Sequence, residues 1–333
     1  MKRKALTLAM LGVFALGACA ETEPATNESI AKMKEALALE AAKTEAGYTI
    51  TGSVNYDVKV GSHTLMDFKL KGLDANFAYR AGNGNDGKAY ASLKYTEFKL
   101  NAYNEDTYEK EFGVETRDAG NHAAIAYVDN NNLYLDISAL GIDSITVEGE
   151  DQPVENGKFL IPGFTSEAED AALPMDITLG MSEDEFDEFV LKRLFTFRKD
   201  GEATEAKASC DASTFKDIYL TSDMARWYTE VRPTIDPDFQ EEAMVAARNR
   251  YSKQFDAIFK TFKVEVGLKY NSKGLVNATL KTNGTIDLSA LENGASISSE
   301  AMIVNWNIDV ALRSSKITIP ESFDTAGYTA IAN

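Results

Sequence analysis

The residues in this chain best suited to chemistry are a glycine-rich segment, two histidines and a cysteine. Gly82, Gly84 and Gly87 match G-x-G-x-x-G, the pattern that binds a dinucleotide pyrophosphate between a strand and a helix. Lys88 and the residues after it have strand character rather than helix character, so the glycines are interpreted as a hairpin turn. A dinucleotide site is therefore not predicted.

The two histidines and Cys210 form no recognisable catalytic set. His63 and His122 are the only histidines, they lie far apart in the chain, and each is flanked by turn residues, which favours surface loop positions over metal ligation. Cys210 is interpreted as a small buried thiol. The sequence contains no nucleophile elbow, P-loop or paired zinc spacing. We therefore predict no enzyme, no catalytic residue, no cofactor and no metal site.

The charge balance is strongly acidic. The chain has 333 residues and a formal net charge of −18, which repels nucleic acid and anionic lipid headgroups. Hydrophobic residues make up 44% of the chain, a value typical of a globular protein. Nucleic acid is excluded as a partner, and the sequence identifies no protein partner.

The first eighteen residues have the plan of an export signal. Lys2, Arg3 and Lys4 precede an uninterrupted weakly apolar run from Ala5 to Ala18. A short apolar run after a basic start is typical of a secretory signal peptide, and it is too short to span a bilayer. Residues 1–18 are therefore predicted to be removed.

The end of this signal, Leu16-Gly17-Ala18-Cys19, resembles the lipobox of bacterial lipoproteins. The resemblance implies cleavage before Cys19 and a diacylglycerol on its sulfur. It also implies a place in the cell envelope, anchored by lipid on the extracytoplasmic side of a bacterial membrane. Which membrane carries the protein is left open. Residues 19–26 are predicted to be a lipidated stalk that reaches at most about 25 Å.

The periodicity beyond the stalk predicts a helix and then many strands. Asn27 to about Ala46 has apolar residues on one face of a helix. Tyr48 to Val60 alternates apolar and polar residues, as a half-buried strand does, and shorter alternating runs continue to Ile161. Helical spacing returns over about 182–197 and 237–261, and strands follow again to Phe323.

This order of elements predicts an α+β fold. We expect one large curled antiparallel sheet, a half-barrel, with helices covering its apolar concave face. Residues 27–333 are predicted to form a single body with a helical insertion at about 182–261. In this plan the chain resembles the half-barrel carriers of bacterial envelopes, the LolA, LolB and LprG/LppX lipoproteins. The resemblance implies an apolar trough that binds lipid.

The expected function is that of a membrane-anchored lipoprotein that binds or carries an apolar ligand such as a lipid. The alternative is a structural or adhesive surface lipoprotein that binds another protein and has no ligand cavity. Aromatic stripes at strand or helix spacing also occur in ordinary cores, so the choice between core and trough stays open. The predicted trough lining is Val54, Tyr56, Val58, Phe68, Leu70, Phe255, Phe259, Val304, Trp306 and Ile308.

Overall fold

The computed structural model describes residues 13–14, 22–82, 87–116, 120–153, 157–163, 182–290 and 302–330. Cys19 and most of the predicted signal lie outside the described residues. The strands before the middle of the chain are β1 (Val13–Phe14), β2 (Glu23–Pro24), β3 (Glu45–Val60), β4 (His63–Arg80), β5 (Lys88–Tyr95), β6 (Glu97–Tyr103), β7 (Lys110–Glu115), β8 (His122–Asp129), β9 (Asn132–Asp136), β10 (Ser144–Val147), β11 (Glu150–Pro153) and β12 (Lys158–Pro162).

The second half contains most of the helices. Its strands are β13 (Phe195–Asp200), β14 (Ala203–Asp211), β15 (Phe259–Asn271), β16 (Gly274–Asp287), β17 (Met302–Ser314) and β18 (Thr329–Ala330). The helices of the whole chain are α2 (Asn27–Ala41), α3 (Glu183–Phe186), η2 (Asp187–Leu191), α4 (Lys192–Leu194), α5 (Ala212–Arg226), η3 (Trp227–Val231), η4 (Arg232–Thr234), η5 (Pro237–Phe239), α6 (Gln240–Ile258) and η6 (Leu288–Ala290).

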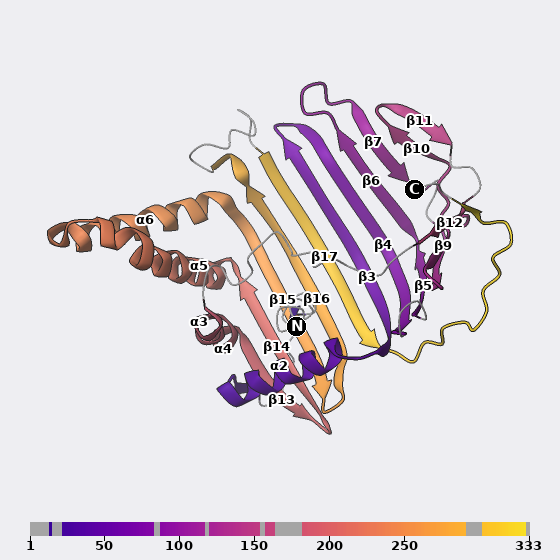
Figure 1. Ribbon diagram of the computed structural model, residues 1–333. Helices are drawn as coiled ribbons and strands as arrows, with labels where there is room; N and C mark the ends of the chain where they lie inside the picture. The colour runs from indigo at the N-terminus through magenta and orange to yellow at the C-terminus, as the bar shows by residue number, and fades with distance from the viewer. Residues whose placement is uncertain are drawn as a thin grey trace.

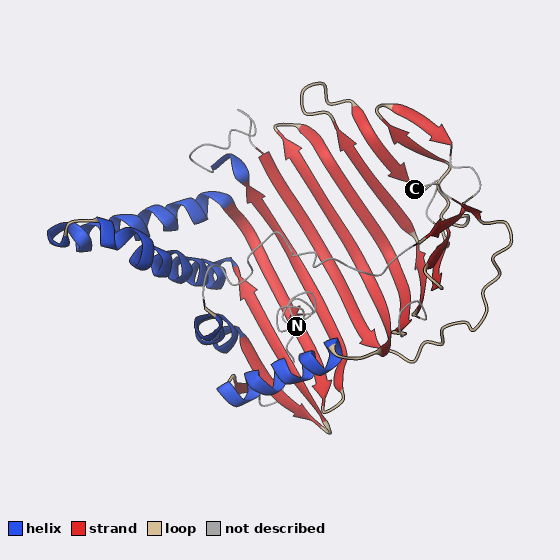
Figure 2. Ribbon diagram, viewed as in Figure 1, coloured by secondary structure: helices blue, strands red, loops and turns tan. Residues whose placement is uncertain are grey.

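All 18 strands of the described residues belong to one sheet. Its centre runs β13-β14-β15-β16-β17-β3-β4 with every neighbouring pair antiparallel. The sheet is curled and open (Figure 1), and helices lie on its concave face and at one edge (Figure 2). The predicted α+β class and curled antiparallel sheet are confirmed.

The sheet forks at β4 because one strand pairs with two different neighbours. Residues 66–71 of β4 pair with β6, whereas residues 74–80 pair with β5. Between the two stretches stands Gly72 with a φ of +61°, a conformation that glycine adopts without steric cost. Beyond the fork, one branch continues through β7, β10 and β11, and the other through β8, β9, β12 and β18.

Over the central strands the convex face of the sheet is polar and carries ion pairs between neighbouring strands. Side chains opposite one another on adjacent strands share a face, so charged residues of alternating sign can pair across the ladder. The pairs include Lys69–Glu97 at 2.5 Å, Arg198–Glu205 at 2.6 Å, Lys281–Asp309 at 2.8 Å and Lys99–Asp67 at 2.9 Å. This explains why polar and apolar residues alternate along the strands, since one face contacts solvent and the other is apolar.

Helix α2 lies across the concave face at one end of β15 and β16 (Figure 1). Thr26 caps it, because its side chain accepts from the backbone N–H of Ser29 at 3.1 Å. The buried side of α2 shares one core with the strands and with η2, and burial of this apolar area holds the helix on the sheet. That core includes Ile30, Met33, Ala36, Leu37, Val190, Phe195, Ala206, Val266, Leu268 and Ala278.

Two expectations about the helical insertion need correction. Within 182–261, residues 195–211 form the β13–β14 hairpin of the main sheet and are not helical. In addition, α6 does not lie along the concave face. Phe255 and Ile258 at its C-terminal end are buried, but α5 and α6 extend together beyond the edge of the sheet (Figure 1). Polar residues around most of α6 explain this, because little of its surface gains from burial.

The ends of the body also differ from expectation. Within the predicted stalk, Glu23 and Pro24 pair with Phe197 and Thr196 at the edge of the sheet. At the other end, the segment expected to be a final strand up to Phe323 is an extended strap on the convex side. Its Ile319 is buried, and Phe323 stacks on Tyr127 with ring centroids 4.7 Å apart.

Candidate functional site

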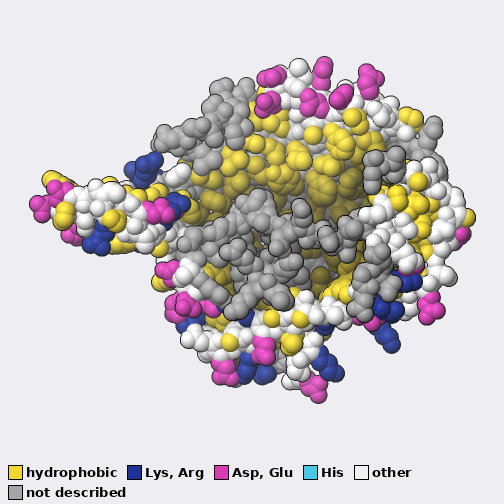
Figure 3. All heavy atoms as spheres, viewed as in Figure 1, with side chains coloured by type: hydrophobic (Ala, Val, Ile, Leu, Met, Phe, Trp, Pro, Cys, Tyr) yellow, Lys and Arg dark blue, Asp and Glu magenta, His cyan; other side chains and the backbone are white. Residues whose placement is uncertain are grey.

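The candidate site is the concave face of the sheet, which we call the trough. Its central row can be followed through the strand register, because directly opposed residues share a face. The row runs Phe262, Gly284, Trp306, Tyr56, Phe68, Leu100, Val114 and Ile145, across eight neighbouring strands. Figure 3 shows hydrophobic side chains lining the part of the concave face that is visible in this view. An apolar surface therefore crosses most of the width of the sheet.

Neighbouring rows are apolar as well. Ile308 stands opposite Val54, and Val54 stands opposite Leu70. Val304 stands opposite Val58 on the other side of the central row. The eight strand residues predicted to line the trough thus lie on one face, in adjacent rows. Val58 and Val304 are buried, and the other six are partly exposed.

Trp306 is the largest side chain of the trough, and its position depends on a glycine. A Cβ at Gly284 would lie 2.3 Å from the indole ring, so only glycine lets the ring lie flat on β16. The indole Nε1–H donates to Thr282 Oγ1 at 2.8 Å. Its one polar group is therefore satisfied inside the trough, and the ring presents an apolar surface.

Phe255 and Phe259, the two helix-side residues predicted to line the trough, belong to an aromatic cluster. Their rings stack at 4.4 Å, and both contact Phe215 of α5. Phe262 joins this cluster to the trough, because its ring contacts Phe215 at 4.7 Å and Trp306 at 6.2 Å. Phe255 is almost fully buried, so it supports the trough wall from behind.

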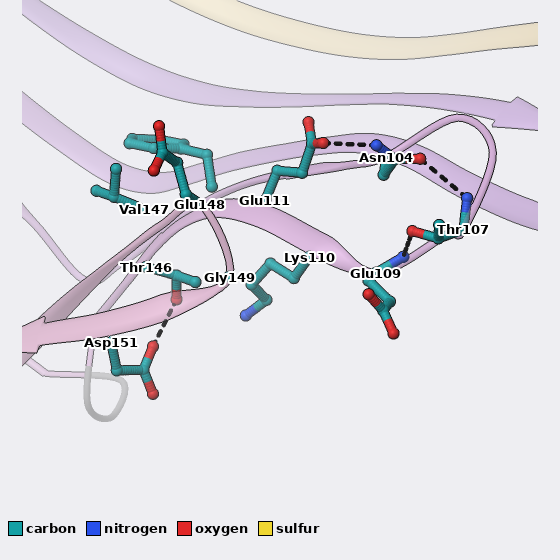
Figure 4. A pocket seen from close by; sticks show the side chains of 11 residues that line it. Asn104, Thr107, Glu109, Lys110, Glu111, Thr146, Val147, Glu148, Gly149 and Asp151 are labelled. Carbon is teal, nitrogen blue, oxygen red and sulfur yellow. Dashed lines mark hydrogen bonds between the residues drawn. The ribbon is translucent and has the colours of Figure 1, made fainter.

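A polar hollow of about 1060 Å³ lies at the rim, between the turn joining β6 to β7 and the turn joining β10 to β11. Figure 4 shows Glu109, Glu111 and Asp151 beside Lys110 in its wall. Two of these carboxylates already have partners, since Asn104 donates to Glu111 at 2.6 Å and Thr146 donates to Asp151 at 2.7 Å. The part of the chain that the structure describes holds no group of three metal-ligating side chains.

None of the residues considered first for chemistry belongs to the central apolar row of the trough. Arg80 and Lys88, which flank the glycine-rich segment, pair as opposite strand residues, so the hairpin interpretation is confirmed, although residues 83–86 are not described. His63 is exposed and stacks on Tyr108 at 3.8 Å. The surface position expected for His122 is wrong, because its side chain is 7% exposed and packs on Tyr95.

Cys210 is buried on the concave side of β14, as expected. Burial, with a smaller effect from Asp211, raises the pKa of its thiol to about 12. A thiol with that pKa is protonated at neutral pH and is a poor nucleophile. The sequence analysis missed two features, the polar hollow at the rim and the burial of His122. Both depend on how turns and strands distant in sequence come together.

Comparison with known proteins identifies no function for this chain. No family model matches this chain, and no curated protein matches it. A beta-barrel-like protein with a domain of unknown function, DUF1849, from Brucella abortus is 8% identical, with 82% of this chain and 99% of that chain covered and a TM-score of 0.13. A double hotdog protein from Mycobacterium tuberculosis, essential for bacterial survival during infection, is 9% identical, with 88% and 82% covered and a TM-score of 0.10.

Proposed function

We propose that this protein is a lipid-anchored carrier or sensor of an apolar envelope molecule, which it binds in the trough. The observation that supports this is the unbroken apolar face around Trp306, whose partly exposed side chains include Tyr56, Phe68 and Ile308. Acyl chains bind such a surface by buried area, at about 25 cal/mol per Å², and need few polar groups. This accounts for a site without a catalytic signature.

The anchoring part of the proposal rests on the lipobox resemblance at Cys19. No helix among the described residues is long and apolar enough to cross a membrane. Acyl chains on Cys19 would hold the body at the bilayer, since each buried methylene contributes about 0.8 kcal/mol. Mass spectrometry of the membrane fraction tests this step. An unmodified Cys19, or a chain that still begins at Met1, would exclude it.

Trp306 provides a direct test of the trough. The chain has only two tryptophans, and the other, Trp227 of η3, is buried. In a form without the signal and with Cys19→Ser and Trp227→Phe, all tryptophan fluorescence comes from Trp306. Bromine quenches indole fluorescence only at contact distance. Dibromostearic acid should therefore quench Trp306 in a saturable way, and stearic acid should compete with it.

The matched control keeps Trp227 and replaces Trp306 by phenylalanine. In this variant dibromostearic acid should quench little, because Trp227 lies outside the trough. Circular dichroism melting confirms that both variants are folded. If Trp306 is not quenched, and protein purified from its native host contains no extractable lipid, the trough is not a ligand site. The structural or adhesive function would then take its place.

A further inference from the structure

Helices α5 and α6, with the short helices between them, form an arm that projects past the edge of the sheet (Figures 1 and 2). Four of the nine large apolar side chains that are exposed in the described residues lie near its far end, at Tyr228, Val231, Phe239 and Val245. Phe239 is 60% exposed and Val245 is 52% exposed. Such a concentration of exposed apolar residues at one tip is typical of a surface that contacts another apolar phase.

The tip is held in place, so its exposure does not come from loose packing. The Tyr228 hydroxyl donates to Met244 Sδ at 2.6 Å, and the guanidinium of Arg232 lies 5.2 Å from the Tyr228 ring. Arg232 Nε also donates to Gln240 at 3.0 Å. Trp227 is buried directly behind Tyr228, with ring centroids 5.3 Å apart. The apolar side chains are thus presented on a rigid support.

The charges beside the tip restrict what it can contact. Asp236 and Asp238 precede the helix α6, and Glu241 and Glu242 occupy its first turn. These four carboxylates are exposed. Arg232 is the nearest cation in sequence to Asp236 and Asp238, and Arg248 is the nearest to Glu241 and Glu242. An anionic lipid surface would repel them, whereas a zwitterionic surface would not.

The arm leaves the sheet at the same edge as the predicted anchor. Glu23 pairs with Phe197 of β13, and only the chain from Cys19 to Glu23, at most about 14 Å long, separates that edge from the acylated residue. β14 lies next to β13, and α5 begins directly after it with Asp211 as its cap. The 19 residues of α6 extend about 28 Å. A membrane that holds Cys19 therefore lies within reach of the arm.

We propose that the tip of the arm is a second membrane contact, which inserts Val231, Phe239 and their apolar neighbours into a zwitterionic lipid surface. The inference rests on the proposed lipid anchoring, because the anchor brings this edge to the membrane. With two points of contact, a lipid chain and the arm, the body no longer rotates freely about its stalk. The trough is then held in a defined orientation to the bilayer.

The experiment uses the whole chain without its signal and with Cys19→Ser, so that no acyl chain contributes. Phe239→Cys is labelled with an environment-sensitive maleimide dye, and Cys210 is protected by its burial and raised pKa. On phosphatidylcholine vesicles the dye emission should shift to the blue. The matched control is Leu39→Cys, an exposed residue of α2 that lies away from the arm, and its dye should not respond.

A change in the lipid composition of the vesicles and a double substitution at the tip complete the test. Replacing a third of the phosphatidylcholine by phosphatidylglycerol should weaken binding at low salt, the reverse of the usual response. The double change Val231→Ser and Phe239→Ser should lower vesicle binding about tenfold, because most of the inserted apolar area is lost. The same variant should keep the quenching of Trp306 by dibromostearic acid, so failure of the arm is distinguishable from failure of the trough.

Three results would overturn the inference. The first is an absence of dye response on both vesicle types, which would leave a protein partner as the occupant of the tip. The second is an equal response at positions 39 and 239, which would indicate general adsorption. The third is a response of the Phe239→Cys dye that appears without vesicles and grows with protein concentration, which would indicate that two arms associate.

Discussion

The carboxylate of Glu40 in α2 accepts the backbone N–H of Leu275, at the turn between β15 and β16, at 2.7 Å. Glu40 is 1% exposed, and it also accepts from the Tyr48 hydroxyl at 2.6 Å and from Lys43 Nζ at 2.7 Å. Burial and the bond to Glu40 raise the pKa of Tyr48, so the phenol remains a donor. One buried side chain thus ties helix α2 to β3 and to the turn between β15 and β16.

Glu40→Ala should destabilise the protein by about 2–4 kcal/mol, because buried donors on Leu275 and Tyr48 lose their acceptor. The control is Glu35→Ala, an exposed acid on the same helix, which should change stability by less than about 0.5 kcal/mol. Urea unfolding followed by circular dichroism measures both. Equal midpoints for the two variants would show that the buried carboxylate does not hold the helix.

Gly274→Ala should be more costly than Gly201→Ala, because Gly274 has both a less favourable backbone conformation for alanine and a close neighbour. Gly274 has a φ of +112°, and a Cβ there would lie 2.4 Å from Glu40 Oε2. Gly201 has a φ of +62° and nothing within 4 Å of the corresponding position, so Gly201→Ala should cost only about 1–2 kcal/mol of conformational strain. The difference in unfolding free energy between the two variants measures the clash with Glu40 together with the greater backbone strain at Gly274.

Gly284→Ala should displace Trp306 from its seat on β16. The added methyl would overlap the indole, so the bond from Trp306 to Thr282 breaks and stability falls by about 1–3 kcal/mol. In the Trp227→Phe background the emission maximum should shift, and quenching by dibromostearic acid should weaken. Asn283→Ala, which removes an exposed side chain on the opposite face, should leave both signals unchanged.

Cys210 should not react with a maleimide at about pH 8 in the folded protein with Cys19→Ser, because only a trace of a thiol with a pKa of about 12 is then ionised. After unfolding in urea one equivalent should react. Rapid labelling of the native protein would mean that β14 opens readily and that the core beneath α2 is less stable than its burial indicates.

The ion pairs of the convex face should contribute less to the stability of the fold in acid. Burial opposes ionisation of Glu205, but hydrogen bonds from Arg198 and Lys207 outweigh it and lower the pKa below 4.5. In the unfolded chain the pKa returns to its ordinary value, so the ion pairs stabilise the fold above about pH 4.5 and are lost as the pH falls through the lower folded pKa. The stability difference between wild type and Glu205→Gln should therefore be present at about pH 6 and shrink by about pH 3. A constant difference in urea midpoint would contradict this.

The sequence by itself determined the faces of the strands. Alternation from Val54 to Val58 and from Val304 to Ile308 is a local property with a period of two, and it identifies which side chains share a face before any pairing is known. It also determined local signals such as the helix start at Ser182, whose N–H donates to Glu185 at 2.9 Å as a capping box requires. These features need only neighbouring residues.

Only the tertiary structure decided which other elements pack against those faces. Three features depend on which apolar surfaces compete for burial. They are the position of α2 over β15 and β16, the place of residues 195–211 in the sheet, and the direction of α6 away from the sheet. Whether Trp306 lies flat depends on Gly284, which becomes its neighbour only through strand pairing. Contacts of this kind join residues distant in sequence, because burial acts on surfaces brought together by the whole fold, and no local period encodes which surfaces those are.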